Sequence, residues 1–194
     1  IVEPATLATM RALALARPDA GLVGADVRDA DGRHEPAARR REPTWRRALA
    51  RVRGDRDALA LPAPPDGSEA SEVDATSGAL MLVRRELFDR LGGFDPGYRL
   101  HCEDLDLCRR IRDDGRVVLV AERARAFHAQ GGSSRRRPLF VAFHKHRGMQ
   151  RYFGKHERAR VAAPLAWLIE AGIWLRFALI APVLVVRELA ARLR

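Results

Sequence analysis

The chain has 194 residues, 47% of them hydrophobic, which is enough for one domain with a buried core and an appendage. Its formal net charge is +10 and nearly all of the positive charge is arginine, so contact with nucleic acid, a nucleotide phosphate or anionic lipid is expected. The two cysteines, Cys102 and Cys108, exclude a disulfide framework and a four-cysteine zinc site and favour a reducing compartment. The chain opens on Ile1 with no secretory signal pattern, and we expect it to be a piece of a longer protein.

The first part of the chain predicts a helix, a strand and a basic segment. Residues 5–16, rich in alanine and leucine, predict a helix that stops before Pro18. Residues 21–27 predict a short buried strand, followed by a turn at 29–32. Residues 33–56 then hold nine arginines against three acidic residues. The simplest interpretation is a solvated or loosely ordered surface segment, and the alternative is a loop that contacts an anion.

Alternating strands and helices continue after a proline-rich stretch. Residues 61–74 combine prolines with small and acidic residues and predict a mobile loop, not a strand. Residues 77–83 predict a buried strand, and residues 84–91 a short helix that ends at Gly92. A further helix starts near Asp104, turns Leu107, Cys108 and Ile111 toward the core, and ends at Gly115. Residues 117–120 predict another buried strand, with Phe127 and His128 beyond its end. This alternation indicates an α/β layered domain with its site at the strand ends.

An acidic cluster, Glu103, Asp104 and Asp106, stands at the start of one predicted helix. Carboxylates in a first helical turn are stabilised by the helix dipole by about 0.3–1 kcal/mol each, so N-terminal capping is one explanation. Capping needs only one acid, however, and the preceding GGFDP turn is expected to bring a loop over the same strand ends. Neighbouring carboxylates also raise one another's proton affinity, which suits a general base. Capping and catalysis therefore both stay open.

His128 is the other candidate site residue on this stretch. It follows a buried strand and precedes the loop Gly131-Gly132-Ser133-Ser134, whose amides could cradle phosphate oxygens. A lone histidine is more often structural than a ligand, so His128 needs a partner before it counts as one.

The run SGALMLVRRELFDRLGGFDPGYRLHCEDLDLCRRIRDDGRVVLVAERARAFHAQGGSS resembles the second half of the catalytic domain of family 2 glycosyltransferases. Its small-residue strand, RR-x-x-F-x-x-x-GGFD element, ED-x-D helix start, G-x-x-V strand and H-x-x-G-G-S match the family in order and spacing. The similarity is greatest to rhamnosyltransferase-like and galactofuranosyltransferase-like enzymes of bacterial surface glycans. The earlier stretches VEPATLATMRAL and RPDAGLVGADVRDADGR are similar to the region that follows the family's acidic metal motif.

The resemblance implies a GT-A fold, a nucleotide-diphosphate sugar donor, a divalent cation (Mg²⁺ or Mn²⁺) and inversion at the anomeric carbon. It assigns the catalytic base to Asp104, supported by Glu103. It assigns His128 to the metal or the donor diphosphate. The acceptor-binding residues that it implies are Gly92, Gly93, Phe94, Asp95 and Asp106, and the donor-binding residues are Gly78, Gly131, Gly132 and Ser133.

The resemblance also implies that an N-terminal nucleotide-binding half with an Asp-x-Asp-like motif is missing from this chain. We therefore expect the 194 residues alone to bind donor weakly and not to turn over.

Residues 135–160 carry seven arginines and two lysines against Glu157, interleaved with aromatic residues. Such a segment is typical of single-stranded nucleic-acid binding or of contact with an anionic membrane, where each charge contributes about 1 kcal/mol. The nearly apolar residues 161–194 favour the membrane over nucleic acid.

Two uncharged runs in this tail, 161–169 and 177–186, are each shorter than the ~18 residues that a spanning helix needs. On a helical wheel all six charges of the tail fall in one sector of roughly 160°. The opposite face holds Leu168, Leu175, Leu179, Val186 and Leu189. Pro164 and Pro182 are expected to kink or divide the helix. The pattern favours amphipathic helices lying in the membrane interface, with packing on the protein's own core and a tilted or re-entrant span as alternatives.

Together these observations predict residues 1–134 as the C-terminal part of a GT-A domain, 135–160 as a basic connection and 161–194 as a membrane-associating tail. The expected function is inverting glycosyl transfer to a glycan or polyprenyl-linked acceptor, at the cytoplasmic face of the plasma membrane. A nucleic-acid-binding module and a non-catalytic membrane adaptor with a degenerate transferase fold are the alternatives.

Overall fold

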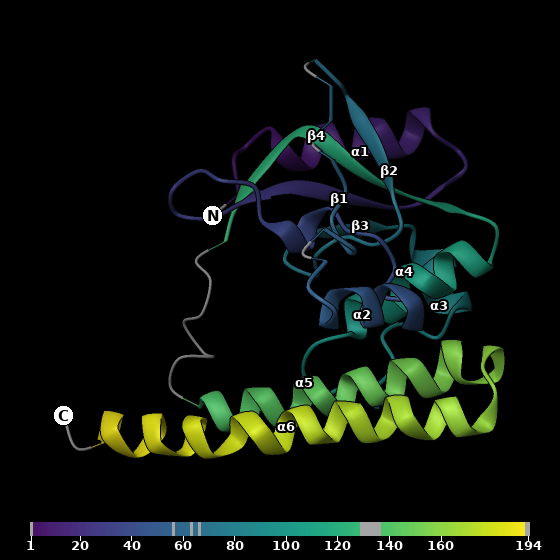
Figure 1. Ribbon diagram of the computed structural model, residues 1–194. Coiled ribbons are helices and arrows are strands. Elements are labelled where there is room, and N and C mark those ends of the chain that lie inside the picture. The colour runs from purple at the N-terminus through teal and green to yellow at the C-terminus, as the bar shows by residue number, and fades with distance from the viewer. Residues whose placement is uncertain (1, 56, 63, 66, 129–136, 193–194) are drawn as a thin grey trace. The chain divides into compact units, whose positions relative to one another are not determined.

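The structure is a computed structural model that describes residues 2–55, 57–62, 64–65, 67–128 and 137–192 (Figure 1). The chain forms two compact units. The first comprises residues 1–95 and 104–130, and the second comprises residues 96–103 and 131–194. The acidic cluster therefore stands where the chain passes from the second unit back into the first.

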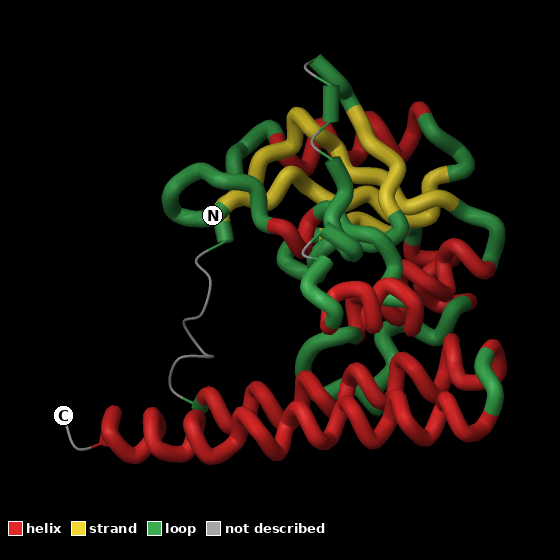
Figure 2. The backbone as a smooth tube through the Cα atoms, in the orientation of Figure 1, coloured by secondary structure: helices red, strands yellow, loops and turns green. Residues whose placement is uncertain are grey.

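The first unit is built on a four-stranded mixed sheet, whose strands are yellow in Figure 2. Its strands are β1 (Ala20–Arg28), β2 (Ala70–Val73), β3 (Met81–Val83) and β4 (Val117–Phe127), in the order β2-β4-β1-β3. The central strands β1 and β4 are parallel, and each outer strand is antiparallel to its neighbour. Strand β1 is buried along almost its whole length instead of alternating, as expected for a strand that is covered on both faces.

Helix α1 (Thr6–Ala16) covers one face of this sheet, and α4 (Glu103–Asp113) lies on the opposite side (Figure 1). Met10 of α1 is fully buried in a cluster with β1 and β4. From α4, Leu107, Cys108 and Ile111 are fully buried, as the sequence predicted. The close approach requires Gly21, because a Cβ atom there would lie 2.5 Å from Cγ2 of Ile111.

The sequence predicted α1, β1, α3 (Arg85–Arg90) and α4 within a few residues of their bounds, but three other predictions were wrong. Residues 61–74 are not all loop, because residues 70–73 form β2 through antiparallel pairing with β4. The strand predicted over residues 77–83 forms only at Met81–Val83, as β3. Strand β4 does not stop at residue 120, since after a bulge its residues 125–127 pair with 26–28 of β1. Phe127 is therefore part of the strand.

The arginine-rich segment 33–56 is more ordered than the sequence suggested. It contains the short 3₁₀ helix η1 (Pro36–Ala38) and the helix α2 (Trp45–Val52). Arg39 and Glu42 are buried, although a solvated surface segment was expected. The local composition was misleading because the partners of these charges come from distant parts of the chain.

The second unit is a pair of helices joined by two short turns. Helix α5 (Pro138–Tyr152) continues into the π-helical turn η2 (Phe153–Glu157) and the 3₁₀ turn η3 (Arg158–Arg160), and α6 (Ala163–Arg192) follows. Phe143 of α5 packs against Trp174 and Phe177 of α6. Nε1 of Trp174 donates a hydrogen bond to Oε1 of Gln150 at 3.1 Å. The aromatic residues of the basic segment thus contribute to the packing of this pair.

Helix α6 is one continuous element of 30 residues, about 45 Å long. The expected division at its prolines was wrong. Pro164 lies in the first turn, where a missing N–H costs no intrahelical bond, and the helix continues through Pro182. Among the described residues, α6 is the one helix that is long and apolar enough to cross a membrane, judged by length and composition alone.

Candidate active site

Asp104 lies in the first turn of α4 and its carboxylate is held by three donors. Oδ2 accepts from Nη2 of Arg40 at 2.6 Å and from the backbone N–H of Gly78 at 3.2 Å. Oδ1 accepts from the backbone N–H of the next residue, Leu105, at 2.8 Å, so the carboxylate lies against the amides of the first helical turn. The structure therefore brings together Asp104 and Gly78, two of the predicted site residues, and adds Arg40.

Glu103 is the first residue of α4. Its Oε2 atom is buried and, within the described parts of the chain, has no hydrogen-bond partner. The two residues before it, His101 and Cys102, have φ values of 66° and 71°. Left-handed backbone is unfavourable for residues other than glycine and clusters at functional sites. The backbone that leads into the acidic cluster is thus strained.

Asp106 points into the protein, not toward solvent. Its side chain is fully buried and its Oδ2 accepts from Nε of Arg110 at 2.8 Å. The same guanidinium donates to the carbonyl oxygens of Leu91 at 2.7 Å and Gly93 at 2.8 Å. Asp106 therefore supports the GGFD turn through Arg110, and in this arrangement its carboxylate is not available to an acceptor.

The predicted acceptor loop follows α3. Gly92 and Gly93 have φ values of 78° and 67°, which glycine adopts without cost, and their amides cap the carbonyls of Asp89 and Phe88. Phe94 is 46% exposed and packs edge-on against Phe88, with ring centroids 5.6 Å apart. The two phenylalanines line a shallow hollow with Met81, Val83, Arg85, Asp89 and Leu107. Asp95 ends the loop and is the last residue of the first unit's opening segment.

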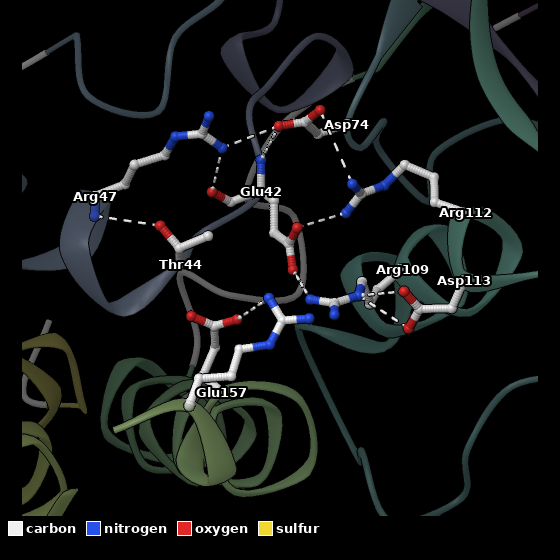
Figure 3. A network of polar contacts seen from close by, with 9 residues as sticks. Glu42, Thr44, Arg47, Asp74, Arg109, Arg112, Asp113 and Glu157 are labelled. Atoms are coloured by element: carbon white, nitrogen blue, oxygen red, sulfur yellow. Dashed lines mark hydrogen bonds and ion pairs between the residues drawn. The ribbon is translucent and has the colours of Figure 1, made fainter. Parts of the chain in front are cut away.

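Residues 39–42 connect the arginine-rich segment to the rest of the first unit. Arg39 pairs with Glu122 of β4 at 2.9 Å, and both side chains are largely buried. Arg40 pairs with Asp104, as described above. Glu42 pairs with Arg109 and, at 2.7 Å, with Arg112, both on α4. Figure 3 shows Glu42 between these two arginines, next to the Asp74 and Arg47 pair.

The Glu42 network is electrostatically well matched. Burial disfavours the charge of Arg109, but hydrogen bonds to Asp113 and Glu42 outweigh it and raise the pKa of Arg109 above its usual value. The backbone N–H of Glu42 also donates to Asp74 at 2.9 Å. The segment that carries Arg40 is therefore fixed from the α4 side and from the β2 side.

His128 directly follows β4, and its Nδ1 lies 3.3 Å from Oε2 of Glu35. Imidazole nitrogen and carboxylate oxygen are ligand types that Mn²⁺ accepts, so this pair fits part of a metal site. No group of three or more His, Cys, Asp or Glu side chains that could hold a metal ion occurs within the described ranges. The predicted donor-site residues Gly131, Gly132 and Ser133 lie outside the described residues.

Sequence reasoning did not single out Arg40, Glu42, Arg110 or Glu35. Arg40 and Arg110 each stand beside other arginines, and Glu35 and Glu42 are isolated acids in an arginine-rich stretch, so no local signal showed which distant residue each one contacts. The contacts of Arg40 and Glu42 join residues 64 to 70 positions apart.

Comparison with known proteins assigns the chain to a protein family. The family model described as "Glycosyltransferase like family 2" matches residues 1–167. The chain belongs to glycosyltransferase family 2. Family membership is consistent with the mixed α/β fold of the first unit and with a partial GT-A domain.

Relatives of this chain in two bacterial species are named as rhamnosyltransferases. The chain is 30% identical over 164 residues to N-acetylglucosaminyl-diphospho-decaprenol L-rhamnosyltransferase of Mycobacterium tuberculosis, in strains CDC 1551 / Oshkosh and H37Rv. That match covers 82% of this chain and 53% of the relative. The chain is also 54% identical over 58 residues to rhamnosyltransferase WbbL of Escherichia coli K12, covering 29% of this chain and 20% of the relative. The chain thus spans about half the length of its mycobacterial relatives.

Proposed function

We propose that the protein to which this chain belongs transfers a sugar from a nucleotide-diphosphate donor to a lipid-linked or glycan acceptor, with inversion at the anomeric carbon, in the synthesis of a bacterial cell-surface polysaccharide. The observation that supports this most directly is the Asp104 carboxylate, held at the start of α4 by Arg40 and Gly78. Family membership and the rhamnosyltransferase relatives support the reaction class.

In the proposed reaction Asp104 accepts the proton of the acceptor hydroxyl as its oxygen attacks the anomeric carbon. The new bond forms between that oxygen and the anomeric carbon. The bond from the anomeric carbon to the diphosphate oxygen breaks, and its electron pair leaves with the nucleoside diphosphate. Phe94 and the Gly92-Gly93 turn, held by Arg110, form one wall of the acceptor site in this proposal.

Family 2 enzymes commonly use a divalent cation. In this chain, we propose His128 and Glu35 as residues that hold it, because they present a nitrogen and an oxygen donor side by side. A bound Mg²⁺ or Mn²⁺ would neutralise charge on the diphosphate leaving group.

We also propose that the acceptor is linked to a lipid and that α6 attaches the protein to the membrane surface that holds it, on the cytoplasmic side. The name of the mycobacterial relative specifies a decaprenol-linked acceptor. The five residues of the predicted apolar face of α6, Leu168, Leu175, Leu179, Val186 and Leu189, are all exposed. A lipid surface would cover that face and confine enzyme and acceptor to two dimensions.

The reaction is tested with the full-length protein that contains this sequence. Labelled nucleoside-diphosphate sugars, beginning with the L-rhamnosyl donor, are offered with polyprenyl-diphosphate-linked N-acetylglucosamine, and the anomeric configuration of the product is read by NMR. We expect Asp104→Asn to lower kcat by roughly 10²- to 10⁴-fold, because the base is lost, and to leave donor binding intact.

Asp31→Asn is the matched control, since Asp31 is an exposed carboxylate that pairs with Arg33 in its own turn. This variant should transfer the sugar at the same rate as the unaltered protein. Transfer by Asp104→Asn at the unaltered rate would contradict the proposal, as would a product that retains the donor configuration.

A further inference from the structure

The Asp104 carboxylate has one position left for a further hydrogen bond. An ionised carboxylate accepts at about four lone-pair sites, two on each oxygen. Among the described residues, Arg40 and Gly78 occupy both sites on Oδ2, and the Leu105 amide occupies one site on Oδ1. The free site is therefore on Oδ1, on a side chain that is already held in one orientation.

Arg40 is placed for this contact by its backbone. Its amide donates to the carbonyl oxygen of Ala75 at 3.1 Å, and its carbonyl oxygen accepts from the Ala75 amide at 3.0 Å. Ala75 stands just before the Thr76 to Gly78 stretch that also reaches Asp104. The guanidinium and the Gly78 amide therefore approach Oδ2 from two segments that are bonded to each other.

The neighbours of Arg40 prevent this segment from moving away easily. Arg39 is anchored to Glu122, and Glu42 is anchored to Arg109 and Arg112, all through ion pairs with little exposure. Removing one partner from a buried pair is strongly destabilising, so such pairs resist separation. Arg40 is thus a fixed charge beside Asp104 and not one arm of a mobile surface loop.

We propose that Arg40 is a positioning residue for the transfer reaction: it holds Oδ2 of Asp104 so that Oδ1 takes the proton of the acceptor hydroxyl. This inference rests on the proposed function. The electron pair of the broken O–H bond forms the new glycosidic bond, the proton goes to Oδ1, and the nucleoside diphosphate leaves as before. A bond of 2.6 Å between opposite charges is of the strong, charge-assisted kind that can fix a rotamer.

The test compares Arg40→Gln, Arg40→Lys and the double variant Arg40→Gln/Asp104→Asn in the full-length protein. Arg40→Gln should lower kcat by roughly 10²-fold, because a misplaced catalytic group costs about that much, with the KM for donor unchanged. Arg40→Lys keeps the charge and should recover at least part of the lost kcat. The double variant should be no slower than Asp104→Asn alone, because Arg40 acts only through Asp104.

Arg33→Gln is the matched control, since Arg33 lies in the same basic segment but is exposed. A normal kcat for Arg40→Gln overturns the inference while the proposed function stands. A double variant that is slower than Asp104→Asn alone also overturns the inference. So does a loss of kcat in Arg40→Gln that is accompanied by a lowered melting temperature and that Arg40→Lys does not recover, because that result indicates a structural role. Absence of transfer by the unaltered protein overturns the proposed function itself.

Discussion

At the scale of single residues, Asp104 and Cys108 lie one turn apart on α4 but have different surroundings. Asp104 pairs with Arg40 at 2.6 Å and is partly exposed, whereas Cys108 is fully buried. Burial raises the pKa of the Cys108 thiol to about 11; a hydrogen bond with the Thr76 backbone opposes this shift, and the charge of Asp104 adds to it. Cys108 is therefore a packing residue and not a nucleophile, because the thiolate is the reactive form.

The Cys108 thiol should resist alkylation in the folded chain. With a pKa of about 11, roughly one thiol in 10³ is ionised at pH 8, and the rate should rise about tenfold for each pH unit up to pH 10. Iodoacetamide labelling followed by peptide mass spectrometry measures this rate. The same chain in denaturant is the control, where Cys108 should react as an ordinary thiol. Equal rates in the folded and denatured chains would show that Cys108 is accessible and ionised.

At the scale of elements, the Glu42 network connects residues 39–47 to α4 and to the end of β2. Its members are far apart in sequence, and 67 positions separate Glu42 from Arg109. The network turns an arginine-rich stretch into part of the scaffold around Asp104. We expect its removal to affect stability first.

Glu42→Gln should lower the free energy of unfolding by about 3 kcal/mol, because it leaves two largely buried guanidinium groups without this carboxylate. Urea denaturation followed by circular dichroism measures the change. Asp31→Asn is the control: it removes the exposed Arg33–Asp31 pair and should cost less than about 1 kcal/mol. If the two substitutions had equal effects, the network would not contribute more than a surface ion pair.

At the scale of the whole molecule, the packing of α5 on α6 bears on how the second unit meets a membrane. Helix α6 is long and apolar enough to cross a membrane, but α5 packs beside it and carries three positive charges, Lys145, Arg147 and Arg151. A charge at the centre of a bilayer costs about 2.5–3.5 kcal/mol. If α6 crossed the membrane, it would either separate from α5 or carry the charges of α5 into the bilayer. If α6 lies in the membrane interface, the two helices stay packed together.

The double variant Leu175→Asp/Leu179→Asp should lose binding to vesicles that contain phosphatidylglycerol, because it places two charges on the proposed lipid-facing side. Flotation measures the bound fraction, and removal of residues 161–194 should have the same effect. Carbonate at high pH should release the unaltered chain if it is peripheral.

The matched control for flotation is Leu7→Asp/Leu15→Asp on α1. Those leucines are 56% and 58% exposed, against 61% and 69% for Leu175 and Leu179. This control should float like the unaltered chain. Equal flotation of both double variants would contradict membrane binding through the apolar face of α6. Resistance to carbonate would indicate that α6 crosses the membrane.

The sequence alone predicted the elements whose signal is local. The signals for these elements each depend on a few neighbouring residues: the alanine and leucine content of α1, the buried run of β1, the glycines after α3 and the acidic start of α4. The same local motifs, in order, also identified the family.

Only the tertiary structure decided features that depend on distant partners. Residues 70–73 become a strand because β4 offers them an edge, and β4 extends to Phe127 because β1 pairs with it beyond a bulge. The sequence placed Asp104 at a helix start, but its pairing with Arg40 joins positions 64 apart. Composition cannot show which of nine arginines meets a given carboxylate, because that choice is made by the path of the backbone and by burial.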